Sequence, residues 1–130
     1  MRVVVGERMG GPEVLAVADR EAPRPGPGEV VVEVAAAGVN YMDIYQREGV
    51  GNYRTDPPFV PGAEGAGTVV AVGSDVKDLS VGDHVAWAGQ GSSYAEQVAL
   101  SANRVVPVPD GMNLQVAAAA ILQGMTAHYL

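Results

Sequence analysis

The chain has 130 residues, 48% of them hydrophobic and 18% charged, and its formal net charge is −7. This length suits one domain and this composition predicts an ordered core, while the acidic balance, without a cluster of Lys or Arg, argues against a nucleic-acid surface and a polybasic membrane patch. There is no cysteine, which excludes a disulfide and a thiolate metal site.

About seven short runs rich in β-branched residues stand between turn signals, and each is typical of a strand. In chain order they are Arg2 to Val5, Val14 to Val17, Glu29 to Val34, Gly67 to Val72, His84 to Trp87, Tyr94 to Val98 and Arg104 to Val108. The segments between them carry prolines and glycines, whose backbone angles suit turns. Strands so closely spaced favour a barrel or a sandwich over a doubly wound sheet.

A short helix is predicted over residues 40–47. Here Tyr41, Ile44 and Tyr45 recur at the spacing that places them on one face of a helical turn. Asn40 precedes them and is a residue type that caps helices.

A second helix is predicted from Asn113 onward, because the run 115–122 has high helix propensity and Asn113 can cap it. Gly124 interrupts this pattern, and Met125 to Leu130 begins another apolar stretch without a polar end or a C-cap. We therefore expect that the chain stops within an element.

Neither an export signal nor a membrane span is expected. The first residues reach charge after three apolar positions, whereas a signal peptide needs a longer apolar stretch. The longest apolar run, Val116 to Leu122, is far shorter than the roughly 20 residues that cross a bilayer. The sequence therefore predicts a cytoplasmic protein.

The stretch from Pro61 to Val76 contains three glycines within six residues, at positions 62, 65 and 67. A dinucleotide-binding loop needs a strand before it and a helix N-terminus after it, so that backbone N–H groups face the pyrophosphate. Here a proline precedes the glycines and a Val-rich strand follows them. This context argues against nucleotide-phosphate binding by the loop.

The same stretch resembles the signature of zinc-dependent alcohol dehydrogenases, which is Gly-His-Glu-x-x-Gly, then five residues, then a small residue and an apolar one. The residues in its register are Gly62, Glu64, Gly67, Gly73 and Val76. Ala63 stands where that signature has histidine. Where those enzymes carry Gly-Val-Cys-His-x-Asp, residues 38–43 read Gly-Val-Asn-Tyr-Met-Asp, so Asn40 replaces the zinc-binding cysteine. The cysteine-rich structural-zinc lobe is also absent.

These departures resemble the quinone oxidoreductase (zeta-crystallin-like) branch of the medium-chain dehydrogenase/reductases. Supporting stretches are Gly11 to Leu15, Asn40 to Gly49 and Gln123 to Ala127. The resemblance implies a mainly β fold, a GroES-like, twisted and partly open β-barrel with short helices. This substrate-side domain would cover residues 1–112. Residues 113–130 would be a connecting helix and the truncated start of a Rossmann-type nucleotide-binding domain.

The resemblance also implies a function, the NADPH-dependent reduction of quinones by direct hydride transfer without zinc, in a protein that is a homodimer at full length. Alcohol dehydrogenation uses a Lewis acid to stabilise an alkoxide. A quinone or enone instead delocalises the charge that hydride brings, so that hydrogen-bond donors suffice and water or a tyrosine supplies the proton. Two alternatives stay open: a reductase of alkenals or other enones from the same superfamily, and a non-catalytic GroES-like binding module.

Four site residues are carried over from the resemblance. Asn40 would lie beside the nicotinamide ribose, Tyr45 against the cofactor and Tyr53 at the substrate end, with both tyrosines as catalytic candidates. Thr126 would lie near the nicotinamide carboxamide. Each has a plainer alternative, because Asn and Thr also cap helices and tyrosines also serve in packing.

Asp43 and Glu64 are candidates for a buried polar network at the position of the lost zinc, with a structural role. His84, in a turn, and His128, near the chain end, have no second ligand at metal spacing. No metal site is predicted.

Overall fold

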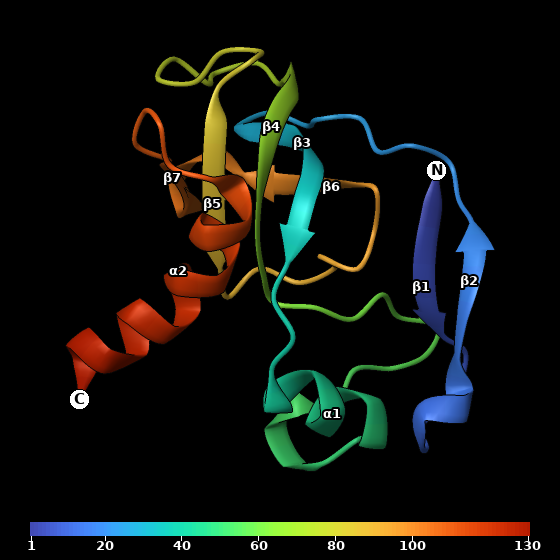
Figure 1. The fold of residues 1–130 in the computed structure, drawn as a ribbon. Helices are drawn as coiled ribbons and strands as arrows, with labels where there is room; N and C mark the ends of the chain where they lie inside the picture. Colours follow the sequence, from blue (N-terminus) through green and yellow to red (C-terminus); the bar gives the residue numbers. More distant parts are fainter.

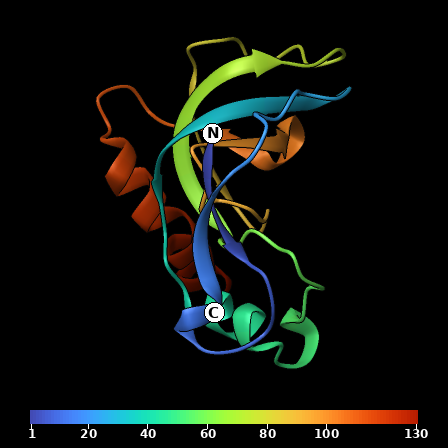
Figure 2. The same ribbon diagram turned by 90° about the vertical axis from the view of Figure 1, so that its right-hand side faces the viewer.

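The computed structural model describes residues 1–130 and is mainly β, as the sequence predicts. A five-stranded antiparallel sheet in the order β6-β3-β4-β5-β7 forms the body, and β1 and β2 form a separate hairpin beside it (Figure 1). The strands are β1 (Arg2–Gly6), β2 (Leu15–Asp19), β3 (Glu29–Ala37), β4 (Glu64–Val72), β5 (His84–Ala88), β6 (Gln97–Ser101) and β7 (Val105–Pro107). Strands β3 and β4 curve strongly, as Figure 2 shows, and the sheet does not close into a barrel.

Two α-helices and three 3-10 turns complete the fold. Helix α1 (Tyr41–Glu48) follows β3 below the sheet, and α2 (Leu114–Tyr129) packs across β3, β4 and β5 (Figure 1). The 3-10 turns span Pro12–Val14, Gly51–Tyr53 and Ala102–Arg104. Neither α-helix has the length and apolar character that a membrane-spanning helix requires.

The core lies on one face of the sheet because alternate residues of each strand point to the same side. Its members are Val30, Val32, Val69, Val85, Trp87, Val98, Leu100 and Val105. Each fully buried side chain of this size contributes about 1.5–3 kcal/mol. On the other face, Ala66 and Ala86 of the sheet meet Ala117 and Ala118 of α2, and these small side chains let the helix approach the strands closely.

The hairpin is joined to the body at its first strand. Isolated bridges pair Val3 with Ala95 and Gly6 with Phe59. The Arg2 guanidinium also holds the Glu96 carboxylate, at 2.7 Å from Nε and 2.6 Å from Nη2. Since Tyr94 to Glu96 pair with β1, the predicted strand from Tyr94 to Val98 is displaced, and the sheet strand β6 starts only at Gln97.

The other boundaries differ mainly at element ends. Residues 12–14 form a 3-10 turn begun by a proline, so the second strand starts at Leu15 rather than Val14. Strand β3 continues to Ala37 and β4 begins at Glu64, which places residues 64–67 inside a strand.

The expected interruption at Gly124 is wrong, because α2 runs through it to Tyr129. Glycine costs about 1 kcal/mol relative to alanine in a helix, and the strong helix formers on both sides outweigh this. Thr126 is therefore an interior helix residue and not an N-cap: its hydroxyl donates to the Leu122 carbonyl at 2.9 Å.

Candidate cofactor and substrate site

Three segments far apart in sequence meet where β3 ends. Asn40 leads from β3 into α1, Glu64 opens β4, and Gln123 belongs to α2. Antiparallel pairing of β3 with β4 sets Ala37 opposite Gly65, so the residues just outside this pair come together. The structure thus brings Asn40 together with Glu64, the neighbour of Ala63, so the two segments that resemble the zinc-ligand segments of the dehydrogenases meet.

Glu64 lies at the centre of this cluster, and the residue is only 1% exposed. Its Oε1 accepts from Asn40 Nδ2 at 2.8 Å and from Gln123 Nε2 at 3.2 Å, and its Oε2 accepts from the Leu122 N–H at 3.0 Å. A buried carboxylate is stable only when donors surround it in this way. Gly38 leaves room for the Glu64 carboxylate, because any residue with a Cβ at position 38 would overlap the Glu64 side chain.

Asn40 is the residue before α1, and its main chain takes part in capping. The Asn40 N–H donates to Asp43 Oδ2 at 2.9 Å, and the Asn40 carbonyl accepts from the Asp43 N–H at 3.0 Å. The side chain is used elsewhere: Nδ2 donates to Glu64 and Oδ1 accepts from Gln123 Nε2 at 2.9 Å. The side chain is therefore fixed from outside the helix, and its second Nδ2 hydrogen remains free for another partner.

Asp43 forms the second half of the network with Tyr94. Asp43 is 7% exposed, and its Oδ2 also accepts from the Tyr94 hydroxyl at 2.9 Å. Burial of the ring, followed by the hydrogen bond to Asp43, raises the pKa of Tyr94 well above its ordinary value. The Tyr94 ring packs against Gly62, whose φ of 97° also favours glycine. The buried network expected around Asp43 and Glu64 is present.

The two candidate tyrosines lie next to each other. Tyr45 comes from α1 and Tyr53 from the following 3-10 turn, and their ring centroids are 5.5 Å apart with planes tilted by 46°. Both rings are partly exposed, so both can contact a ligand.

A small cavity of about 190 Å³ adjoins Tyr53. It is lined by Met42, Asp43, Gln46, Tyr53, Gly62, Ala63, Gly89 and Gly91. Ala63 and Tyr53 thus border the same space. Pockets that enclose a whole small ligand are usually about 300–1,000 Å³, so this cavity suits one end of a ligand.

Thr126 is the fourth candidate. It lies one turn beyond Gln123 in α2 and is exposed, and its hydroxyl donates within the helix. Gln123 itself contacts both Asn40 and Glu64.

Three residues of the network were not predicted from the sequence: Gln123, Leu122 and Tyr94. Their hydrogen-bond partners are 51 to 83 residues away in the chain, so no local pattern indicates them.

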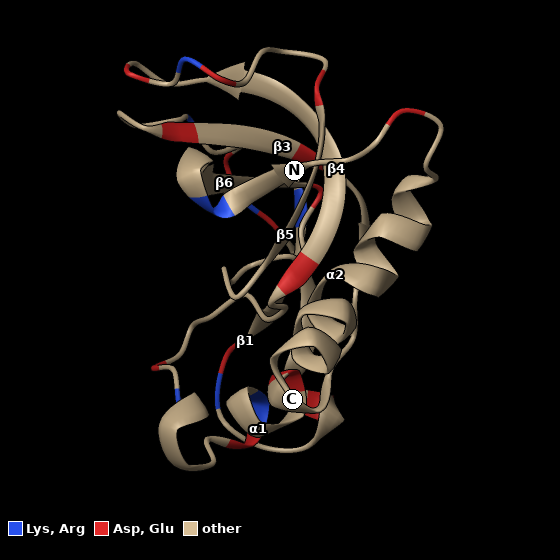
Figure 3. Ribbon diagram, turned by 90° about the vertical axis from the view of Figure 1, so that its left-hand side faces the viewer, with Lys and Arg blue, Asp and Glu red and all other residues tan.

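Lys and Arg are spread thinly over the molecule (Figure 3), and no group of three or more His, Cys, Asp or Glu side chains could hold a metal ion. His84 and His128 are both exposed.

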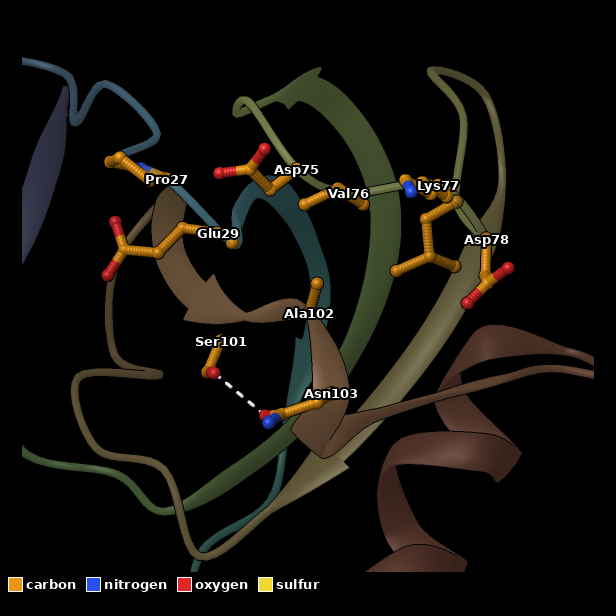
Figure 4. A pocket seen from close by; sticks show the side chains of 11 residues that line it. Pro27, Glu29, Asp75, Val76, Lys77, Asp78, Ser101, Ala102 and Asn103 are labelled. Carbon is orange, nitrogen blue, oxygen red and sulfur yellow. Dashed lines mark hydrogen bonds between the residues drawn. The ribbon is translucent and has the colours of Figure 1, made fainter.

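A larger hollow of about 420 Å³ lies beside the loop after β4 and is lined by Glu29, Asp75, Lys77 and Asp78 among others (Figure 4). It includes none of the candidate site residues.

Comparisons with known proteins agree with the fold described above. Residues 26–110 match the family of the alcohol dehydrogenase GroES-like domain. Over 125 residues the chain is 44% identical to a Pseudomonas aeruginosa protein named quinone oxidoreductase, a match that covers 93% of this chain and 37% of that protein. It is also 35% identical over 130 residues to the synaptic vesicle membrane protein VAT-1 homolog of Rattus norvegicus, covering 98% and 32% respectively.

A crystal structure of Escherichia coli quinone oxidoreductase complexed with NADPH superposes with a TM-score of 0.95 at 32% identity. This superposition covers 99% of the present chain and 40% of that chain. The chain spans less than half the length of the proteins that it matches.

Proposed function

We propose that this chain, which belongs to the alcohol dehydrogenase GroES-like domain family, forms the substrate-side domain of a reductase that transfers hydride from NADPH to quinones. The observation that carries the proposal is the hydrogen-bonded set of amides around Glu64, next to a cavity that Tyr53 lines. Relatives named quinone oxidoreductase, and the neighbour described as an NADPH complex, support it.

We propose that the reductase works without zinc. The side chain of Asn40 is engaged with Glu64 and Gln123, and Ala63 has no ligand atom. A quinone does not need a Lewis acid, because its ring delocalises the negative charge that hydride brings. The amide and hydroxyl donors of this site are sufficient for that purpose.

The residues present fit one half of the proposed cofactor. Asn40, Gln123 and Thr126 offer neutral donors and acceptors, which suit the nicotinamide riboside end, and no Lys or Arg stands among them to hold a phosphate. When bound, NADPH supplies the hydride. We assign the phosphates to the nucleotide-binding domain that would follow the connecting helix at residues 113–130, with residues 1–112 as the substrate-side domain.

Within this arrangement, Asn40, Tyr45 and Thr126 orient the cofactor. Tyr45 and Tyr53 border the substrate, and Tyr53 lines the cavity together with Gly62 and Ala63. A tyrosine hydroxyl or a water molecule supplies the proton to the reduced carbonyl oxygen. In the proposal, the full-length protein is a cytoplasmic homodimer.

A reductase of alkenals or other enones is the second candidate. The cavity of about 190 Å³ supports this candidate as well as the first, because it only needs to hold the carbonyl-bearing end of the substrate, which enones and quinones share. The relative named as a vesicle membrane protein shows that similar chains also carry other names.

The test is an assay of the full-length protein against a panel of quinones and enones, with NADPH and NADH in parallel. We expect the highest kcat/KM for a quinone with NADPH. A protein that binds neither nicotinamide would refute the assignment, and a preference for enones would select the second candidate.

A further inference from the structure

The Glu64 carboxylate determines which atoms of the neighbouring amides face outward. An ionised carboxylate only accepts hydrogen bonds. Asn40 must therefore turn Nδ2 toward Glu64 Oε1, at 2.8 Å, which leaves Asn40 Oδ1 to accept from Gln123 Nε2 at 2.9 Å. With Glu64 removed, either amide could rotate by half a turn and exchange its oxygen and nitrogen.

The fixed pair presents one donor and one acceptor. Asn40 retains the second hydrogen on Nδ2, and Gln123, whose Nε2 points to Asn40 and Glu64, retains its carbonyl oxygen. Asn40 is half-buried and Gln123 is exposed, so both remaining groups can meet a ligand. Such a pair matches a neutral group that both donates and accepts, such as a primary carboxamide or a hydroxyl.

The buried charge also selects against anions. Glu64 has no cationic partner among its contacts, since all of its donors are neutral amides or backbone. Its negative charge is therefore felt at the adjacent amides, and an anionic ligand group would be repelled there.

We propose that Glu64 is a positioning residue that fixes the donor–acceptor polarity of the Asn40–Gln123 pair, and that Gln123 thereby contacts the neutral nicotinamide riboside end of the cofactor. This inference rests on the proposed function, because it takes that cofactor as the ligand. Gln123 becomes a cofactor-contacting residue in addition to Asn40, Tyr45 and Thr126.

The main experiment exchanges the charge between two positions in the full-length protein. Glu64→Gln puts an amide nitrogen opposite another donor, so we expect a lower melting temperature and an NADPH Kd, from cofactor fluorescence, that is five to ten times higher, roughly the range of one or two neutral hydrogen bonds. Adding Asn40→Asp supplies an acceptor for the new amide at position 64. The double variant should recover much of the melting temperature but not the Kd, because a carboxylate at position 40 has no hydrogen to donate to the ligand.

Recovery of both the melting temperature and the Kd in the double variant would show that Glu64 is only structural and would overturn the proposal. If the double variant does not fold, Gln123→Met decides. The variant loses one of the donors to Glu64, so its melting temperature should fall moderately while the fold is kept, and the Kd should rise about five-fold.

Gln115→Met, an exposed position in the first turn of the same helix, is the matched control and should alter neither quantity. A Gln123→Met variant that binds NADPH like the wild type would refute the proposal. A wild-type protein that does not bind NADPH would instead refute the proposed function, so the two failures are distinguishable.

Discussion

Gly38→Ala should be among the most damaging single-methyl additions in this domain. The three atoms nearest to a Cβ built on Gly38 are Oε1, Cδ and Cγ of Glu64, and all would overlap it. The backbone itself tolerates alanine, because Gly38 is not one of the glycines with positive φ. The damage therefore comes from the carboxylate, which has to leave its position.

The size of the effect follows from what the carboxylate loses. Glu64 would give up its hydrogen bonds to Asn40, Gln123 and the Leu122 N–H while remaining a buried charge. Leaving a buried polar group unsatisfied costs about 1–3 kcal/mol, and more when the group is charged, so we expect a loss of about 3 kcal/mol or more. Since whole domains are stable by about 5–15 kcal/mol, the variant should still fold but with a much lower unfolding midpoint.

The assay is urea and thermal unfolding of full-length variants in a double-mutant cycle. Glu64→Ala removes the clashing atoms, so Gly38→Ala should cost less than about 1 kcal/mol in that background. Gly124→Ala serves as the control methyl addition: it has open space in a helix and should stabilise by about 1 kcal/mol. An equal cost for Gly38→Ala in both backgrounds would refute the assignment of the clash to Glu64.

Four further predictions test the site. Tyr45→Phe should weaken NADPH binding or turnover while costing under about 1 kcal/mol of stability. Asn40→Ala should weaken them too, and because it removes a donor from the buried Glu64 carboxylate it should also cost about 1–3 kcal/mol; a variant of Asn40 with a lowered melting temperature and unchanged kinetics would favour a purely structural role. Elemental analysis should find no stoichiometric zinc, and a chelator should leave activity intact. Because the folded-state pKa of Tyr94 is raised, its contribution to stability should be complete below the ordinary tyrosine pKa and be lost as the pH rises above it, and Tyr94→Phe should remove this alkaline loss. Residues 1–130 alone should not bind NADPH at micromolar concentrations by calorimetry.

Local sequence patterns are sufficient for most of the fold. The valine-rich strands were predictable because their alternation and the surrounding turn residues are local signals. The sixth strand was misplaced because Tyr94 to Glu96 have the same pattern but pair with β1, a choice that tertiary contacts make. The break at Gly124 was wrong for the opposite reason, since helix formers on both sides outweigh one glycine.

The candidate site was predictable only in part. The resemblance to the dehydrogenase signature pointed to Asp43 and Glu64, and the structure joins each of them to a network. Tyr94 and Gln123 could not be found, because nothing near them in sequence indicates a partner in another segment. Geometry alone assigns them.

The alanine contacts between α2 and the sheet have a consequence for how the helix angle is determined. Side chains as short as Ala117 and Ala118 make nearly smooth surfaces against Ala66 and Ala86, without the ridges and grooves that normally select one crossing angle. Rotation of α2 about its own axis is opposed by Leu114 and Ile121, which also pack against this cluster, and by the hydrogen bonds of the Leu122 N–H and the Gln123 side chain to a single carboxylate. A relative that replaces one of these alanines with a larger residue should show a tilted helix, and whatever follows that helix in the chain would be displaced in proportion to its distance from the sheet.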